Sequence, residues 1–381
     1  MTRPPILFSR PFRASAELPN IEAVLSSDHV HGDGPFTASA TARLGQLTGS
    51  PHVLLTTSCT HALDMAALLL DLGPGDEVIL PSFTFPSMAT AVALRGARCV
   101  FVDIDPATGN IDPDLVAGAI TPLTAAVFVM HYGGVAVDLD PLIEISEAHA
   151  LPLVEDTAHG LGGTWRGRSL GTIGTFGTLS FHDTKNIHCG EGGALLLSDD
   201  ELMLRAEMVR EKGTDRTRFL RGHVDKYSWR ELGSSYLPSE LNAAVLDAQL
   251  AQFVEIHGYR RKVWDTYDTE LTDWAAHTGF RQMYVPPDRV HTAHLYYFLA
   301  PDREHRDALM NHLGLLGIAA PFHYMPLDSS AAGKRFGYTP MPCKHSAGFS
   351  ERLIRLPLWP GMTESEVDRI LAGVTSFRGQ H

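Results

Sequence analysis

The sequence Ser180-Phe-His-Asp-Thr-Lys-Asn186 separates two apolar runs that have the length and composition of buried strands. Gly174-Thr-Phe-Gly-Thr-Leu179 precedes it, and Gly190-Glu-Gly-Gly193 follows it and opens Ala194-Leu-Leu-Leu197. Lys185, one of six lysines, therefore sits in an irregular loop between two strands. Desolvation there would lower its pKa and make it a nucleophile for carbonyl carbon, as in a Schiff-base lysine. The stretch alone also fits an ordinary surface-loop lysine.

Before this loop, apolar strands alternate with helices. We predict strands at 53–56, 77–80, 99–102, 125–130 and 151–154, separated by helices at 61–70, 85–95, 115–120 and 139–150. Such alternation produces right-handed βαβ units and a mostly parallel sheet. Ligands bind beyond the carboxyl ends of the strands in sheets of this kind. The polar residues that follow these strands should therefore gather with the Lys185 loop at one edge.

The remaining segments complete a two-domain interpretation. We expect an irregular stretch over the first fifty residues, a helix at 201–211 and a long helical pattern at 241–267. Further on, we predict strands at 293–300 and 318–324 and helices at 303–316, 345–355 and 363–374. These elements suggest a large domain over residues 1–250 and a smaller C-terminal α+β domain over residues 251–381.

Composition excludes several classes of protein. The chain of 381 residues is 44% apolar and 20% charged and has no low-complexity tract, which argues against disorder. The net charge of −13 and the lack of a basic cluster argue against nucleic-acid binding. The four cysteines (Cys59, Cys99, Cys189, Cys343) have neither the spacing of a metal site nor that of a disulfide framework, so we expect no bound metal. The sequence shows no signal peptide and no apolar run long enough to span a membrane, so we expect a cytoplasmic protein that does not bind membranes. Neither the dinucleotide glycine motif nor a P-loop is present.

Four features after the predicted strands could carry chemistry. Thr57-Ser-Cys-Thr60 at a strand-to-helix turn is suited to cradle an anion, or simply to cap the helix. Asp156 ends an apolar strand, where a carboxylate caps a helix or pairs with a buried cation such as a pyridinium nitrogen. Phe85 could stack on a flat heterocycle or fill the core, and His159 could face the same ligand or be structural.

Together these residues resemble the fold-type-I, pyridoxal phosphate-dependent sugar-nucleotide aminotransferases of the DegT/StrS type, over essentially the whole chain. The segments that carry the resemblance are Gly32-Asp-Gly-Pro-Phe36, Thr57-Ser-Cys-Thr60, Pro74-Gly-Asp-Glu-Val78, Pro81-Ser-Phe-Thr-Phe85, His131-Tyr-Gly133, Val154-Glu-Asp156, Ser180-Phe-His182 with Lys185, Glu191-Gly-Gly193 and His323-Tyr-Met-Pro-Leu327. The run from Arg210-Glu-Lys-Gly-Thr214 to Gly233-Ser-Ser-Tyr-Leu237 is similar to members that make dTDP-4-amino-4,6-dideoxygalactose. The implied fold has a large domain, whose mostly parallel mixed sheet lies between helices, and a smaller C-terminal domain.

The resemblance implies pyridoxal 5′-phosphate as cofactor, with pyridoxamine 5′-phosphate as its intermediate form. Lys185 would hold the cofactor as a Schiff base and move protons, and Asp156 would pair with the ring nitrogen. The other implied cofactor contacts are Ser58, Cys59, Thr60, Phe85, His159, Ser180 and, across a homodimer, Ser235. Ser235 replaces the asparagine of the family's Gly-x-Asn-x-Arg-Met pattern, and Leu237 replaces its arginine. Asp328 also departs from the histidine that often follows Pro-Leu.

The implied reaction passes the amino group of L-glutamate, which becomes 2-oxoglutarate, to C4 of dTDP-4-keto-6-deoxy-D-glucose. The product would be a dTDP-4-amino-4,6-dideoxyhexose, galacto or gluco. The implied substrate contacts are Phe36, His131, Tyr132, Arg210, Lys212, Arg216, Arg221, Lys226, Arg230, His323 and Tyr324. The basic members of this set equally fit a solvated face or a dimer rim.

Three alternatives differ in chemistry. Amination at C3 of a 3-keto sugar nucleotide is compatible with the same residues. Related 3-dehydratases carry histidine at the lysine position, so Lys185 argues against dehydration. A catalytically idle, regulatory relative should have lost Lys185 or Asp156, and both are present. The sequence leaves open the product epimer, the pathway and any assembly beyond a dimer.

Overall fold

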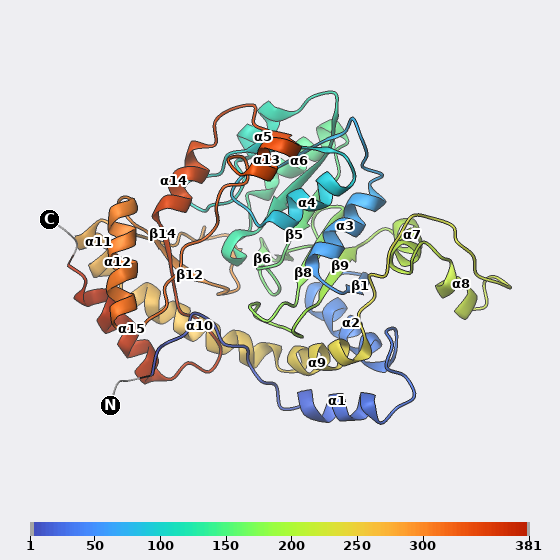
Figure 1. Cartoon of the computed structure of the whole chain (residues 1–381), viewed down its shortest axis with the longest axis horizontal. Coiled ribbons are helices and arrows are strands. Elements are labelled where there is room, and N and C mark those ends of the chain that lie inside the picture. The colour runs from blue at the N-terminus through green and yellow to red at the C-terminus, as the bar shows by residue number, and fades with distance from the viewer. Residues whose placement is uncertain (1–3, 379–381) are drawn as a thin grey trace.

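The computed structural model describes residues 4–378, and an eight-stranded mixed sheet forms its centre (Figure 1). Its strand order is β1 (His52–Thr56), β9 (Gly193–Leu197), β8 (Phe176–Ser180), β5 (Leu153–Asp156), β4 (Thr124–Met130), β2 (Glu77–Pro81), β3 (Arg98–Val102) and β13 (Gly337–Tyr338). Only β9 runs antiparallel to its neighbours; the other adjacent pairs are parallel. The predicted, mostly parallel sheet is therefore confirmed.

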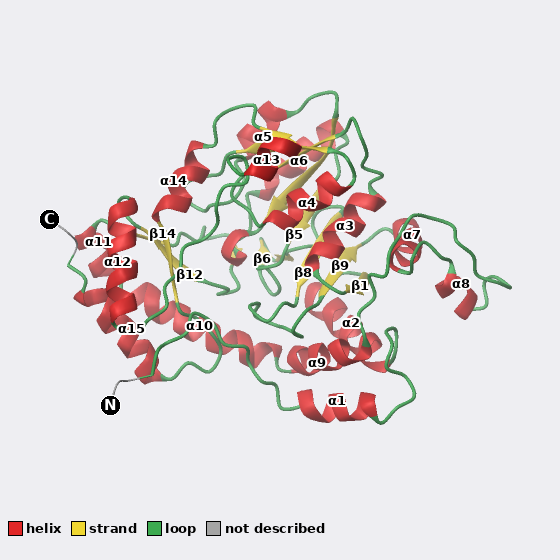
Figure 2. Ribbon diagram, viewed as in Figure 1, coloured by secondary structure: helices red, strands yellow, loops and turns green. Residues whose placement is uncertain are grey.

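Helices cover both faces of this sheet because successive strand residues point to opposite sides. One face packs against α3 (Cys59–Leu69), α4 (Pro86–Leu94) and α7 (Asp200–Arg210), and the other packs against α2 (Pro35–Thr48), α5 (Pro113–Ala119), α6 (Leu139–His149) and α9 (Glu240–Ala251). On β4, Phe128 belongs to the first core, and Val127 and Val129 belong to the second. A sheet sandwiched by helices was the predicted fold class, and Figure 2 shows the layers.

A second, antiparallel sheet is built from β10 (Arg281–Gln282), β12 (Tyr296–Leu299) and β14 (Leu353–Leu356). Around it lie α11 (Thr272–Thr278), α12 (Arg303–Leu315), α14 (Lys344–Arg352) and α15 (Glu364–Ser376), and α10 (Phe253–Glu270) runs on from α9 toward this part (Figure 1). The predicted boundary between the two domains at residue 250 stays a prediction. Residues 1–3 of the first predicted domain and 379–381 of the second lie outside the described residues. The shorter elements are α1 (Glu17–Leu25), α8 (Arg216–Leu220), α13 (Ala331–Phe336), the 3₁₀ turn Tyr132–Gly134 and a ribbon of β6 (Thr164–Trp165), β7 (Arg168–Ser169) and β11 (Arg289–Val290).

Four predictions of local structure were wrong. The first fifty residues contain α1 and α2 instead of an irregular stretch. The helical pattern at 241–267 is two helices, α9 and α10, which meet at Gln252. The segment 318–324 is not a strand, because only Ile318 forms a bridge, with Ile6. The helix expected at 345–355 ends at Arg352, and β14 follows it.

The topology brings several chain segments to one edge of the large sheet. The carboxyl ends of β1, β5 and β8 lie there together with the start of β9, which runs the opposite way. Gly193 opens β9 against the start of α3: a Cβ on this residue would stand 2.3 Å from the Ser58 carbonyl carbon and 2.4 Å from the Cys59 nitrogen. The close approach therefore requires glycine. Within residues 4–378, no helix has the length and apolar character needed to cross a membrane.

Candidate active site

A cavity of about 610 Å³ opens at this edge of the sheet. Of the predicted site residues, those that line it are Ser58, Cys59, Thr60, Phe85, Asp156, His159, Ser180, Lys185, His323 and Tyr324. They come from the ends of β5 and β8, from the starts of α3 and α4, and from the segment before β13. The structure thus brings most of the predicted cofactor residues into one site.

Lys185 lies in the loop between β8 and β9, in a turn closed by the hydrogen bond that its backbone N–H donates to the His182 carbonyl (2.9 Å). Burial lowers the pKa of its ammonium group below the ordinary 10.5, and the Asp156 carboxylate partly opposes this shift. A lysine with a lowered pKa has a larger neutral fraction at physiological pH, and neutral amine is the nucleophilic form. The lowered pKa agrees with the predicted desolvation of Lys185, and its role as the Schiff-base lysine stays a prediction.

Asp156 is the last residue of β5 and is only 3% exposed. Its Oδ1 accepts a hydrogen bond from the Ala158 N–H (3.0 Å), and the Cys59 thiol lies 3.9 Å away. Burial raises the pKa of the carboxyl group, while the Ala158 N–H and Lys185 act against that shift. With so few donors, this buried carboxylate is suited to receive a cationic N–H from a ligand in the cavity.

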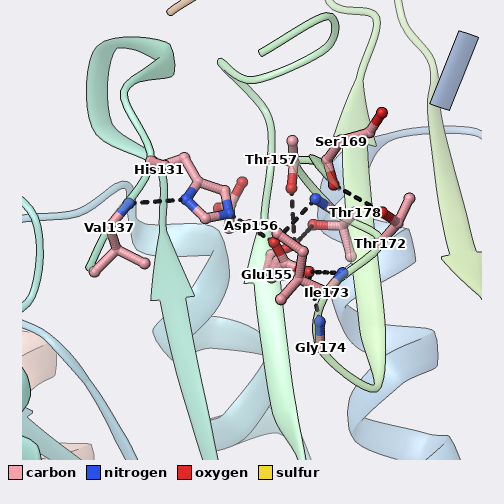
Figure 3. Close-up of polar contacts among 12 residues, drawn as sticks. His131, Val137, Glu155, Asp156, Thr157, Ser169, Thr172, Ile173, Gly174 and Thr178 are labelled. Carbon is pink, nitrogen blue, oxygen red and sulfur yellow. Dashed lines mark hydrogen bonds and ion pairs between the residues drawn. The ribbon is translucent and has the colours of Figure 1, made fainter. Parts of the chain in front are cut away.

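Glu155, the preceding residue of β5, points to the other face of the sheet because strand side chains alternate. His131 donates from Nε2 to its Oε2 (2.9 Å), and the backbone N–H groups of Gly171, Ile173 and Gly174 donate to it at 2.7–3.0 Å (Figure 3). Burial raises the pKa of Glu155, but the His131 hydrogen bond and these N–H groups outweigh it, so that the pKa lies below its ordinary value. His131 is fully buried and does not line the cavity. Its predicted contact with substrate is therefore left out of the proposed site.

The start of α3 brings Ser58, Cys59 and Thr60 to the cavity, and the first backbone N–H groups of any helix have no partner within the helix. Ser58 caps the helix by accepting the His61 N–H (3.1 Å), and the hydroxyls of Thr60 and Ser87 lie 2.7 Å apart. The helix dipole and these donors favour an anion. At the start of α4, the Phe85 ring is 52% exposed and lines the same cavity, which leaves a face available for stacking.

Three histidine rings, those of His159, His294 and His323, also line the cavity. His159 stacks on His294, with centroids 4.0 Å apart and planes at 23°, and His323 lies 6.2 Å from His159 at 21°. Burial lowers the pKa of all three, so the rings are neutral. The Gly133 N–H donates to His159 Nδ1 (3.3 Å), which leaves the ring proton on Nε2, 3.4 Å from the Tyr324 hydroxyl. His159 can therefore donate a hydrogen bond toward the cavity.

Three other predicted residues lie outside the cavity lining of this chain. The Tyr132 hydroxyl is 3.0 Å from His323 Nδ1, so Tyr132 holds that ring from behind. The Phe36 N–H donates to Glu240 Oε2 (2.8 Å) at the start of α2. Ser235 is exposed and forms a bridge with Glu211. None of these three side chains lines the cavity within one subunit, and their contacts with ligand stay predictions.

The predicted basic substrate residues are also absent from the cavity lining. Most of them pair with carboxylates: Arg210 with Asp33 (2.8 Å), Lys212 with Glu211 (3.3 Å), Arg216 with Glu211 (3.8 Å), Arg221 with Glu207 (2.6 Å) and Arg230 with Asp215 (2.9 Å). Lys226 is exposed. Within this subunit, five of the six basic side chains are therefore paired with protein carboxylates, and their contacts with substrate stay a prediction. Asp328 likewise lies beside a protein hydroxyl, that of Ser82.

Sequence reasoning missed several residues of the cavity. They include Phe8, Ser87, Arg260, His294 and Arg355. His294 is fixed by the Asn186 Oδ1, 2.9 Å from its Nδ1, and so is tied to the loop of Lys185. The available signal for Arg355 was its position as the single charge in the apolar run Leu353-Ile-Arg-Leu-Pro-Leu358.

These residues fit a flat, phosphorylated pyridine. The buried carboxylate of Asp156 could pair with a ring nitrogen, and the helix start with its hydroxyls could hold a phosphate. The exposed ring of Phe85 could stack, and Lys185, with its lowered pKa, could bond to a carbonyl carbon. The four cysteines are buried and free, so none of them forms a disulfide bond.

Comparison with known proteins agrees with the geometry. Residues 12–375 match the DegT/DnrJ/EryC1/StrS aminotransferase family. The aminotransferase TlmJ from Streptoalloteichus hindustanus is 31% identical, with 98% of each chain covered and a TM-score of 0.90. DesV from S. venezuelae, solved with a ketimine intermediate, is 29% identical, with 98% of each chain covered and a TM-score of 0.88.

Spr1654 from Streptococcus pneumoniae has been solved in PMP and PLP forms. In the PMP form it is 27% identical, covers 97% of this chain and 98% of its own, and has a TM-score of 0.90. The PLP form is 26% identical, with 98% of each chain covered and a TM-score of 0.89. From the family match, the fold and this cavity, the chain belongs to the DegT/DnrJ/EryC1/StrS aminotransferase family, and pyridoxal phosphate is its cofactor.

Proposed function

We propose that this aminotransferase acts on a nucleotide-linked keto sugar. It would convert dTDP-4-keto-6-deoxy-D-glucose to a dTDP-4-amino-4,6-dideoxyhexose, galacto or gluco, in deoxyaminosugar biosynthesis in the cytoplasm, with L-glutamate as donor. The observation that carries the transamination is the placement of Lys185 and Asp156 in one cavity with the start of α3. The sugar-nucleotide part rests on the sequence resemblance over the 210–237 run.

Each residue has a defined task in this proposal. When bound, pyridoxal phosphate draws electrons from the bond that breaks at the amine-bearing carbon. Lys185, with its lowered pKa, would take the proton from that carbon and pass it to C4′ of the cofactor, with the reverse transfer in the second half-reaction. Asp156 accepts a hydrogen bond from the ring nitrogen and keeps that nitrogen protonated. Ser58, Thr60 and the N–H groups of α3 hold the phosphate, and Phe85 covers the ring.

The sugar and nucleotide ends of the substrate are assigned to different places. We place the sugar beside His323 and Tyr324, which line the cavity. We place the nucleotide against the 212–230 segment of a second subunit in a homodimer. This segment projects from the body with α8 (Figure 1), and it exposes 75% of Trp229, 53% of Tyr227 and 64% of Leu220. Apolar side chains so exposed favour burial against a partner, which would also bring Ser235 of the partner subunit to the phosphate.

The test supplies glutamate with dTDP-4-keto-6-deoxyglucose or with the 3-keto isomer and identifies the product by mass spectrometry and NMR. Formation of a 4-amino sugar with one-to-one formation of 2-oxoglutarate is expected. Amination of the 3-keto isomer alone would support the C3 alternative. Lack of turnover with both substrates and with glutamate would support the idle, regulatory alternative.

A further inference from the structure

The proposed function leaves one ring of the cavity lining without a task, that of His294. This ring stacks on His159, with centroids 4.0 Å apart and planes at 23°. Its Nδ1 lies 2.9 Å from Asn186 Oδ1, and Asn186 follows Lys185 directly in the chain. One imidazole therefore contacts His159 with its face and the Lys185 loop with its edge.

The side-chain amide of Asn186 determines where the His294 ring carries its proton. Its Nδ2 donates to the Thr292 carbonyl (2.9 Å), which can only accept, so its Oδ1 is the atom that faces His294. An amide oxygen also only accepts, so His294 donates from a protonated Nδ1. Burial and the charges of Lys185 and Arg260 lower the pKa of His294, so the ring is neutral. The hydrogen bond to the Lys185 loop therefore has a fixed direction.

The backbone turn that carries His294 is anchored to other parts of the chain. Arg260 on α10 donates from Nε to the Ala293 carbonyl (3.0 Å) and from Nη2 to the His294 carbonyl. The Thr292 hydroxyl donates to the His159 carbonyl (2.6 Å). Ala293 has a φ of 49°, a left-handed conformation that a non-glycine residue keeps only where its surroundings hold it. The backbone thus fixes the place of the His294 ring, in addition to the bond that the ring itself makes.

His159, the other ring of the stack, is a hydrogen-bond donor toward the cavity. Its Nδ1 accepts the Gly133 N–H (3.3 Å), which leaves its proton on Nε2. In the proposed cofactor site, Asp156 takes the ring nitrogen, the start of α3 takes the phosphate and Lys185 takes the aldehyde carbon. The phenolic oxygen beside that carbon is the polar group of the ring that remains for the Nε2–H of His159.

We propose that His294 is a positioning residue for the cofactor, which holds the His159 donor at the phenolic oxygen and ties this donor to the Lys185 loop. This inference rests on the proposed transamination. The ring torsion of a histidine has broad minima, so a ring bonded to protein at one nitrogen can tilt, and contact with a second ring restricts the tilt. A donor that stays aimed at an anionic oxygen makes the stronger, charge-assisted kind of hydrogen bond.

The visible band of the bound cofactor reports on this hydrogen bond. The visible form carries a proton shared between the Lys185 nitrogen and the phenolic oxygen, and the proton is lost as the pH rises. A hydrogen bond donated to the oxygen favours the form without the proton, so it lowers the pH midpoint of the band. Weakening that bond should raise the midpoint by about 0.4 to 1 pH unit, the equivalent of one ordinary hydrogen bond.

The experiment titrates the visible band with pH in wild type, His159→Phe, His294→Leu, His294→Phe and the double variant His159→Phe/His294→Leu. The matched control is His257→Phe, because His257 also stacks on a ring, that of Phe253 at 4.1 Å and 30°, but lies outside the cavity lining. Thermal unfolding and the ratio of bound cofactor to protein report that each variant is folded and loaded. The charged and titratable groups that face the stacked pair are the same in all of these proteins: Lys185, Arg260, His323, Tyr324 and Arg355.

His159→Phe should raise the midpoint by about 0.4 to 1 pH unit, and His294→Leu should raise it by at least half as much. The double variant should shift no further than His159→Phe alone, because a residue that acts through another has no effect once the other is gone. His294→Phe keeps the stacked ring but not the bond to Asn186, so its midpoint should lie between those of wild type and His294→Leu. His257→Phe should keep the wild-type midpoint.

An unchanged midpoint in loaded His294→Leu would overturn the proposal. So would a shift that adds to that of His159→Phe, because it would assign His294 a direct contact with the cofactor. If His294→Leu fails to fold or to bind cofactor, His294→Phe and its double variant with His159→Phe decide the question in the same way. The expected shifts in an enzyme that aminates neither keto sugar would keep the role of His294 and end the proposed sugar reaction. A wild type that binds no cofactor would end both.

Discussion

Two adjacent carboxylates on β5 have opposite roles because a strand sends successive side chains to opposite faces. Asp156 faces the cavity, where burial raises its pKa and few donors reach it. Glu155 faces the α5 and α6 side and is surrounded by His131 and three backbone N–H groups. One carboxylate is therefore kept for a ligand, and the other holds the loop at 171–174 against the sheet.

The matched substitutions Asp156→Asn and Glu155→Gln separate these roles. Asp156→Asn should weaken binding of pyridoxal phosphate by on the order of 10-fold or more, because a charge-assisted hydrogen bond is lost. Glu155→Gln should instead lower the free energy of unfolding by about 3–5 kcal/mol, because it breaks a buried network. Cofactor titration and urea unfolding of the two apo-proteins measure both effects. An Asp156→Asn protein that binds cofactor as wild type does would contradict the assignment.

At this scale, the sequence sufficed for residues that follow strands in the chain. Lys185 and Asp156 could be placed because the carboxyl ends of neighbouring strands meet at one edge. Arg355 and His294 could not, because they reach the cavity from the second sheet and from the turn before β12, through contacts that no local pattern records. His131 lies outside the cavity lining for a related reason: its hydrogen bond to Glu155, on another strand, is a contact that no local pattern records.

In the proposed cofactor site, helix α3 is the element that would hold the phosphate. Ser58 both caps this helix and lines the cavity, whereas Thr363 caps α15 in a capping box with Glu366, away from it. Each cap accepts a backbone N–H near the start of its helix. The two positions therefore allow the capping and ligand contributions to be separated.

Ser58→Ala and Thr363→Ala should each lower the free energy of unfolding by about 1 kcal/mol, because a helix cap is lost. Only Ser58→Ala should also raise the dissociation constant for pyridoxal phosphate, by about 2-fold to 10-fold, since a hydroxyl near the phosphate is removed. Thermal unfolding and titration of the apo-proteins check the pair. Equal cofactor affinity in both variants would remove Ser58 from the phosphate site.

Elements with strong periodic patterns were predictable, and those set by tertiary contacts were not. The strands of the large sheet follow apolar runs, and all five predicted before the Lys185 loop are present. The sequence analysis overlooked helix α2. Pro35 begins this helix and Gly49, at a φ of 75°, follows its last residue; proline at the start and glycine at the end are common signals of helix boundaries. Strand β14 was assigned to a helix because its pairing with β12 is long-range, between residues 296–299 and 353–356.

Across the whole molecule, buried neutral histidines make stability depend on pH. Burial lowers the pKa of His257 to about 4 and of His291 to about 3, and it also lowers the pKa of His159, His294 and His323. In the unfolded chain, these rings titrate near 6.5. As the pH falls below about 6.5, the unfolded state takes up protons that the folded state does not. The apo-protein should therefore lose stability between about pH 6.5 and 4, by up to about 1.4 kcal/mol per pH unit for each histidine.

His257→Gln tests this linkage away from the cavity. His257 lies on α10 beside Phe253, and Arg260 on the same helix adds to the lowering of its pKa. The variant should reduce the slope of unfolding free energy against pH by about 1.4 kcal/mol per unit below pH 6. Urea unfolding at several pH values measures the slope. An identical slope in wild type and variant would show that His257 titrates alike in both states.

We propose that the Lys185 loop holds pyridoxal phosphate for transamination of a nucleotide-linked 4-keto sugar. The most direct measurement is the absorption spectrum of the pure protein before and after addition of dTDP-4-amino-4,6-dideoxyglucose or its galacto epimer, with Lys185→Ala alongside. We predict a visible cofactor band that one epimer converts to the pyridoxamine form, and neither that band nor the conversion in Lys185→Ala. A wild type without the band, or conversion that persists without Lys185, would contradict the account.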